Sequence, residues 1–140
     1  MVTYSTVDYI VVEPEVAGGM GEGTLLDQTT HPPIVTNLHY RFDGWLGDAL
    51  LTTFPCYIAT ALSADHLVRA LMTGFKVDPV QISKSEKFKE SPPGRNLPPF
   101  VWLRIWGIAG VNDLGLLADS TLVLSQDALA LFARHWPCAR

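Results

Sequence analysis

The residues that could carry chemistry begin with a glycine-rich run from Gly18 to Gly23. Such runs bind phosphates when a lysine follows the glycines or when a helix begins directly after them. Here Glu22 stands where a cation would be needed, and Pro32 and Pro33 follow the run instead of a helix. The run therefore predicts a structural surface loop, and we expect neither a nucleotide nor another cofactor.

Four histidines and fourteen acidic residues could supply metal ligands. His39 and Asp43 have the spacing that would bring two side chains together on a helix. On a strand the same spacing separates them by about 13 Å, which is too far for one ion. No H-E-x-x-H motif or other ligand cluster is present in the sequence. We expect no metal site and predict that His39 is a hydrogen-bonding residue beside the core.

The sequence offers no nucleophile paired with its base. No serine occupies a G-x-S-x-G motif, and Cys56 lies in an apolar strand candidate. Cys138 is close to His135, but Pro137 interrupts the helix that would align them. We therefore predict two free thiols and no catalytic residue.

The most distinctive segment runs from Leu38 to Asp48. Large apolar residues alternate with polar ones over 38–43, which predicts a strand with one apolar face. Asp43 and Gly44 then turn the chain, so Asp43, Trp45 and Asp48 could form a projecting patch that binds a partner. In a second, compatible interpretation, Trp45 folds back on the core, Asp43 hydrogen-bonds the turn and Asp48 caps a short helix.

The elements that must position this turn follow from hydrophobic periodicity and helix caps. Further strands are predicted over residues 8–12, 56–60, 75–82, 100–108 and 122–124. The segment 100–108 carries bulky side chains on both faces, which predicts a central strand covered on both sides. Helices are predicted over 49–53, 64–72 and 126–134, with Ser63 and Ser125 as the N-caps of the second and third. The segments 16–33 and 84–97 are predicted to be loops. Because helices and strands do not alternate regularly, the fold class is α+β. We expect a single domain over residues 1–140, with a mostly antiparallel or mixed sheet of about five or six strands and two main helices.

The formal net charge of −4 is unevenly distributed. Residues 1–50 contain seven acidic residues and one basic residue, Arg41, whereas residues 51–100 have a balance of +2 and the remainder is neutral. An acidic first third fits a basic partner better than a phosphate backbone. We therefore expect no binding to nucleic acid.

The hydropathy pattern predicts a soluble, cytoplasmic protein. The longest apolar stretch, 101–111, contains Arg104 and is shorter than the roughly 20 residues that a membrane helix needs. The N-terminus lacks the basic region and the long apolar run of a signal peptide. No membrane interaction is expected.

Several motifs together resemble a family of bacterial immunity proteins that are encoded beside polymorphic toxins. These motifs are the Gly18–Thr24 loop, His31-Pro32-Pro33, the Leu38–Asp48 segment with Phe42-Asp43-Gly44-Trp45-Leu46-Gly47-Asp48 at its centre, and Phe54-Pro55-Cys56. The resemblance extends over residues 9–132. The toxins of this family are delivered by contact-dependent or type VI secretion routes. The chain ends soon after the last predicted helix, where the family continues, so the resemblance implies a shortened C-terminus.

The resemblance implies an inhibitor without enzymatic activity, which binds a cognate toxin and blocks its active site or substrate cleft. The acidic first third then predicts a basic toxin, because clustered charge accelerates encounter. The expected partner-binding residues are Asp43, Trp45, Asp48, Glu22, Asp27 and Met20, with Trp45 as the principal apolar anchor.

Two other function classes stay open at this point. One is a small enzyme or ligand-binding domain with a pocket near His39, Asp43 and Asp48, closed by the glycine-rich loop. The other is a structural subunit of a larger assembly, which a stable homo-oligomer in the absence of any toxin would favour.

Overall fold

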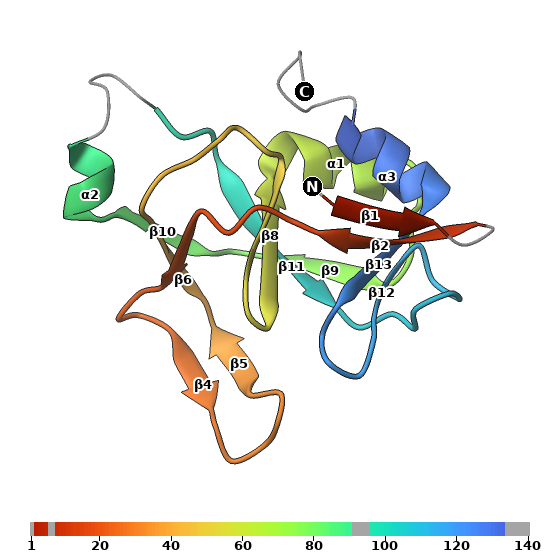
Figure 1. Ribbon diagram of the computed structural model, residues 1–140, viewed down its shortest axis with the longest axis horizontal. Helices are drawn as coiled ribbons and strands as arrows, with labels where there is room; N and C mark the ends of the chain where they lie inside the picture. The colour runs from red at the N-terminus through yellow and green to blue at the C-terminus, as the bar shows by residue number, and fades with distance from the viewer. Residues whose placement is uncertain (1, 6–7, 91–95, 134–140) are drawn as a thin grey trace.

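The chain folds into four small β-sheets and three helices, and this computed structural model describes residues 2–5, 8–90 and 96–133 (Figure 1). The first sheet has the order β1-β2-β13-β12, and its neighbouring strands are antiparallel. Ile10 and Val12 of β2 lie opposite Leu124 and Leu122 of β13, and all four side chains are buried. The strands are β1 (Val2–Ser5), β2 (Tyr9–Glu13), β12 (Leu114–Leu116) and β13 (Leu122–Ser125).

The second sheet is central and is covered on both faces. It has the antiparallel order β7-β8-β11-β9, formed by Leu50–Thr53, Cys56–Thr60, Phe100–Ile105 and Phe75–Asp78, respectively. Alternate side chains of β8 enter two different hydrophobic cores, with Tyr57 and Ala59 in the first and Cys56 and Ile58 in the second. This arrangement confirms the sequence-based expectation that β11 is a central strand with both faces covered.

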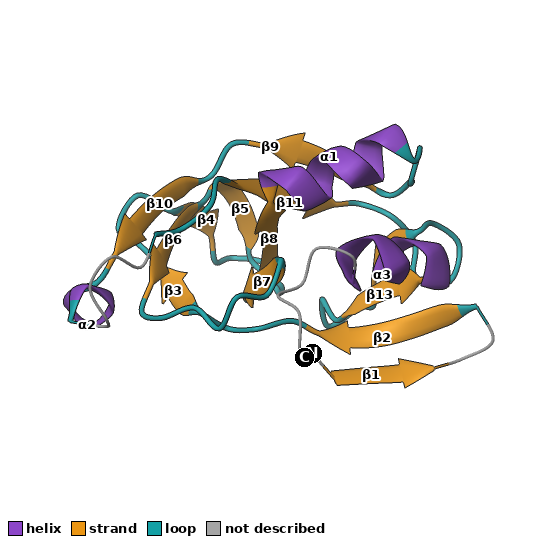
Figure 2. Ribbon diagram, turned by 90° about the horizontal axis from the view of Figure 1, so that it is seen from above, coloured by secondary structure: helices purple, strands orange, loops and turns teal. Residues whose placement is uncertain are grey.

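The first core lies between the first two sheets and helices α1 (Ala61–Arg69) and α3 (Gln126–Ala133) (Figure 2). The second core is closed by the third sheet, which has the order β10-β6-β3. Its strands are Gln81–Lys84, His39–Phe42 and Gly18–Met20, and the short helix α2 (Glu86–Lys89) adds Phe88 to this core. A two-stranded hairpin, β4 (Leu25–Asp27) and β5 (Ile34–Asn37), projects from this side (Figure 1).

The α+β class and the two main helices are as predicted, but the expectation of one sheet with five or six strands was wrong. Residues 16–33 contain β3 and β4, and residues 84–97 contain α2. The segment 75–82 divides at Pro79 into β9 and β10, which belong to different sheets. Strands β3 and β4 have only three residues each, which is too short for a periodic hydrophobic pattern, so they form because of the strands with which they pair.

The helix predicted over 49–53 was also wrong, because this segment is strand β7. Leu50 pairs with Ala59 and Leu51 pairs with Ile58 of β8, and each leucine enters a different core. Burial on both faces of a sheet outweighs the weak helical preference of a five-residue segment. Asp48 therefore caps no helix.

Of the two predicted helix caps, the one at α3 is confirmed and the one at α1 is wrong. Ser125 caps α3 as predicted, because its hydroxyl oxygen accepts the Ala128 N–H at 3.1 Å. Helix α1 begins earlier than expected, since Thr60 is its N-cap and accepts the Ser63 N–H at 3.2 Å. Both caps satisfy N–H groups that the first turn of a helix leaves without a backbone acceptor.

The end of α1 contains a strained residue. Leu71 adopts φ 59 in the position where glycine usually ends a helix, and its side chain is exposed. The Met72 N–H binds the Leu67 carbonyl and the Leu71 N–H binds the Val68 carbonyl, which is the hydrogen-bond pattern of that helix end.

Leu71→Gly is therefore expected to raise the free energy of unfolding by about 0.5–1 kcal/mol, because glycine removes the Cβ clash of the left-handed conformation. Urea denaturation measures this gain. Leu71→Ala is the control, since alanine removes the exposed apolar side chain but keeps the Cβ, and it should give no gain. Equal stability of the glycine and alanine variants would contradict the assignment of strain.

Candidate partner-binding site

The candidate site is centred on the turn that follows β6. The N–H groups of Asp43 and Gly44 both donate to the Ala17 carbonyl, at 2.8 and 3.2 Å. Gly47 has φ 103, a conformation that favours glycine, and lets the chain turn toward β7. Leu46, between these points, is 74% exposed.

Trp45 combines a core contact with a backbone hydrogen bond. Its ring meets Phe100 edge-on, with 5.8 Å between ring centroids, and its indole N–H donates to the Asp48 carbonyl at 2.9 Å. The side chain is only partly buried and lines a surface hollow. This geometry matches the interpretation in which Trp45 folds back on the core.

Glu15 holds the turn in place. One carboxylate oxygen accepts the Leu46 N–H at 2.7 Å, and the other accepts the Asp48 N–H at 3.4 Å. The Glu15 carbonyl in turn accepts the Thr52 N–H from β7 at 3.0 Å. Sequence reasoning missed this residue, because nothing local to Glu15 indicates that its partners lie more than thirty positions further along the chain.

Tyr40 links the segment that carries Glu15 to β7 through two hydrogen bonds. Its fully buried hydroxyl accepts the Ala17 N–H at 2.9 Å and donates to the Thr52 carbonyl at 3.1 Å. Burial raises the pKa of this hydroxyl to about 12. The tyrosine therefore stays protonated and can bridge the two backbone groups.

Tyr40→Phe should lower the free energy of unfolding by about 1–3 kcal/mol, because it leaves a buried N–H and a carbonyl without their partner. Urea denaturation of the purified variant gives this value. Tyr9→Phe provides the matched control, since the Tyr9 hydroxyl donates to Val111 in an exposed position at 3.2 Å. A loss no greater than that of Tyr9→Phe would contradict the bridging role of Tyr40.

The turn borders a shallow hollow of about 420 Å³. Its apolar lining includes Trp45 and the exposed side chains of Val16 and Leu46. Glu15 and Asp43 are its acidic lining residues. Lys87 is the basic residue of the lining. An apolar surface with acidic neighbours suits a partner that offers apolar and basic groups.

The six residues proposed from the sequence do not share one surface. Asp43 and Trp45 line the hollow, but Asp48 is only 2% exposed and lies beneath the turn, so it does not project as expected. Met20 packs partly buried against the second core, and Glu22 is exposed just beyond β3. Asp27 is exposed on β4, where hydrogen bonds from Thr29 lower the pKa of its carboxyl group.

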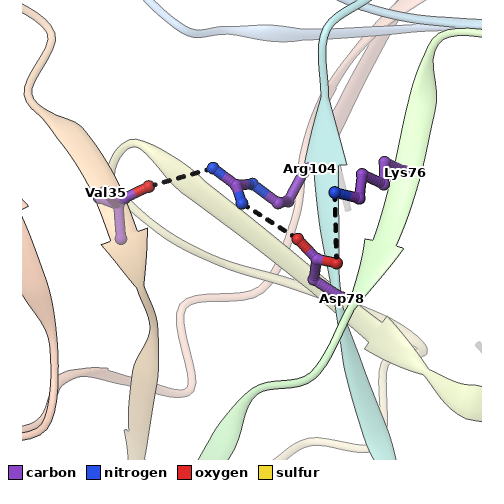
Figure 3. A network of polar contacts seen from close by, with 4 residues as sticks. All are labelled: Val35, Lys76, Asp78 and Arg104. Atoms are coloured by element: carbon purple, nitrogen blue, oxygen red, sulfur yellow. Dashed lines mark hydrogen bonds and ion pairs between the residues drawn. The ribbon is translucent and has the colours of Figure 1, made fainter.

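The hairpin that carries Asp27 is tied to the central sheet by Arg104 (Figure 3). The guanidinium donates to the Val35 carbonyl of β5 at 3.4 Å and pairs with Asp78 of β9 at 3.0 Å. Asp78 also pairs with Lys76 at 3.8 Å, and the guanidinium lies 4.4 Å from the centre of the Trp102 ring. An isolated hairpin is marginally stable in water, so this connection helps to fix its position.

His39 is a structural residue, as the sequence predicted. Its Nδ1 accepts the Gly23 N–H at 2.9 Å, which assigns the ring proton to Nε2, 2.7 Å from the Ser83 hydroxyl. A Cβ on Gly21 would collide with this ring, so glycine is required where the loop crosses it.

In the described part of the chain, the side chains considered for catalysis or metal binding lie apart from one another. No described hollow is lined by His39, Asp43 and Asp48 together. Burial raises the pKa of the free Cys56 thiol to about 12, so this thiol stays protonated at neutral pH. Within residues 8–90 and 96–132, no three side chains of histidine, cysteine, aspartate or glutamate gather into a metal site. The predictions for His135 and Cys138 lie outside the described part of the chain.

Comparison with known proteins gives no further assignment. No family model, curated protein or solved structure matches the chain. Among the described helices, none has the length and apolar character needed to cross a membrane.

Proposed function

We propose that this protein is an immunity protein that binds a cognate, basic, secreted bacterial toxin and blocks its active site or substrate cleft. The observation that carries this proposal is the exposed Leu46, held at the edge of an acid-lined hollow by the Glu15 carboxylate. Leu46, Val16 and Trp45 line this hollow together. A contiguous apolar surface on a fixed backbone is typical of a binding site, because little conformational entropy is lost when a partner covers it.

The charge distribution supports the same proposal. The first fifty residues have an excess of six negative charges, and Asp43 and Glu15 from this part line the hollow. Clustered charge of one sign raises the association rate with an oppositely charged partner by about 10–1,000-fold. An inhibitor that must capture a toxin before damage occurs benefits from this acceleration.

Co-expression with the product of the adjacent upstream gene tests the proposal. We expect the two proteins to co-purify as a complex and this protein to restore growth of cells that express the toxin. Absence of a complex together with absence of growth rescue would overturn the proposal.

A further inference from the structure

Three large apolar side chains are exposed on connected parts of one face. Leu46 is 74% exposed, Val16 is 69% exposed, and Phe54, in the turn between β7 and β8, is 53% exposed. Val16 and Leu46 border the first hollow, and Val16 and Phe54 border a second hollow of about 370 Å³. Val16 therefore joins the two hollows into one elongated surface.

The backbone that carries these side chains is fixed from within. The segment at Glu15 runs parallel to β7, with a bridge between Glu15 and Leu51 and the Thr52 N–H bound to the Glu15 carbonyl. Phe54 directly follows β7, and Leu46 is held by the Glu15 carboxylate. The three apolar groups therefore keep their relative positions before any partner arrives, which lowers the entropic cost of binding.

The charged residues beside these apolar groups are predominantly acidic. Asp43 and Glu15 line the first hollow, and Glu13 and Asp119 line the second. Lys87 is the basic residue in the two linings. Hydrogen bonds from Thr121 lower the pKa of the exposed Asp119, so this carboxylate is ionised at neutral pH.

We propose that the face formed by Leu46, Val16, Phe54, Glu13, Asp43 and Asp119 binds a protein segment in which large apolar side chains are flanked by lysine or arginine. The inference rests on the proposed function and names the surface chemistry of the partner. Apolar side chains of the partner cover the three exposed groups, while its cations meet the carboxylates around them. Glu15 acts as a positioning residue that holds Leu46 at the interface.

Backbone amide NMR with a synthetic peptide of alternating lysine and leucine tests this chemistry. We expect shifts that saturate on titration and that are concentrated at residues 13–17, 43–47, 52–55 and 119–121. A lysine-serine peptide of equal charge and a glutamate-leucine peptide of equal apolar content should both bind at least about tenfold more weakly, because each lacks one of the two recognised groups.

Matched variants locate the binding surface. Leu46→Ser and Asp43→Asn should each weaken binding of the lysine-leucine peptide by about tenfold. Leu62→Ser, which changes a leucine of similar exposure (57%) on α1, should leave binding unchanged. Thermal unfolding followed by circular dichroism establishes that each variant is folded before it is compared.

Two results would overturn the proposed face. Shifts centred on the separate exposed apolar residues Leu71, Trp106 and Ile108 would place binding elsewhere, and equal binding of the lysine-serine peptide would reduce the interaction to charge alone. The toxin experiment distinguishes an error in the proposed face from an error in the proposed function. If the toxin binds wild type and Leu46→Ser equally, the face is wrong while the proposed function stands, whereas absence of any toxin complex overturns the function.

Discussion

Phe42→Ala is expected to lower the free energy of unfolding by about 3–5 kcal/mol, because it removes a fully buried ring from the second core. The Phe42 ring lies 4.8 Å from the Tyr40 ring and 5.2 Å from the Phe100 ring, measured between centroids. It also contacts Phe88 of α2 edge-on at 6.3 Å. The substitution thus opens a cavity where the third sheet, the central sheet and α2 meet.

Urea denaturation compares this variant with Phe54→Ala, which removes the same side chain from a half-exposed position. The exposed variant should lose less than about 1 kcal/mol, because it creates no cavity. A similar loss for both variants, or a loss below about 1 kcal/mol for Phe42→Ala, would contradict the assignment of Phe42 to the core.

Stability should fall steeply as the pH rises above 9, because three buried groups must stay protonated in the folded state. Burial raises the pKa of Tyr40 and of Tyr57 from 10.0 to about 12, and that of Cys56 from 9.0 to about 12. At a pH between the ordinary pKa of each group and its raised pKa in the folded state, the unfolded chain releases a proton that the folded chain retains. A rise in pH therefore favours the unfolded state. Each group then lowers the free energy of unfolding by about 1.4 kcal/mol per pH unit.

Urea denaturation at several pH values between 8 and 12 measures this slope. The folded protein is expected to be lost within the window from pH 9 to pH 12. Cys56→Ala should reduce the slope by about 1.4 kcal/mol per pH unit, because it removes one of the three protons. Constant stability from pH 8 to pH 11 would contradict the burial of these groups.

Local sequence signals predicted the parts of the fold that carry their own pattern. The alternation from Leu38 to Phe42 identified β6 and its buried face. Apolar groups at every second position lie on one face of a strand but not on one face of a helix. Ser125 identified the start of α3, since its hydroxyl caps the first turn. The prediction that His39 is a hydrogen-bonding residue beside the core is confirmed, because its ring takes part in two structural hydrogen bonds.

The remainder depends on contacts between distant parts of the chain. Strand β7 exists because β8 pairs with it and because two cores cover its opposite faces, and neither fact is visible in residues 49–53. The candidate site also depends on such contacts. Sequence reasoning selected Asp43 and Trp45, which line the hollow, but it missed Val16 and Glu15, which reach the turn only after the chain has folded.

Burial of Asp48 also changes how charge at the site should be tested. A lysine in place of Asp48 would bury a cation and strongly destabilise the fold, so reversal of charge must use Asp43. Asp65→Lys on α1 changes the net charge by the same amount and lines neither hollow. The pair of variants therefore separates charge at the face from overall charge.

The central claim is tested most directly by the association rate of the proposed toxin, for which the product of the adjacent upstream gene is the candidate, measured against ionic strength. Between about 0.01 M and 1 M salt, where the screening length falls from roughly 30 Å to 3 Å, the wild-type rate should fall steeply. Asp43→Lys should associate more slowly at low salt and lose much of this dependence, whereas Asp65→Lys should resemble wild type. A wild-type rate that is independent of salt, or equal rates for folded Asp43→Lys and wild type, would contradict the claim that this acidic face captures a basic toxin.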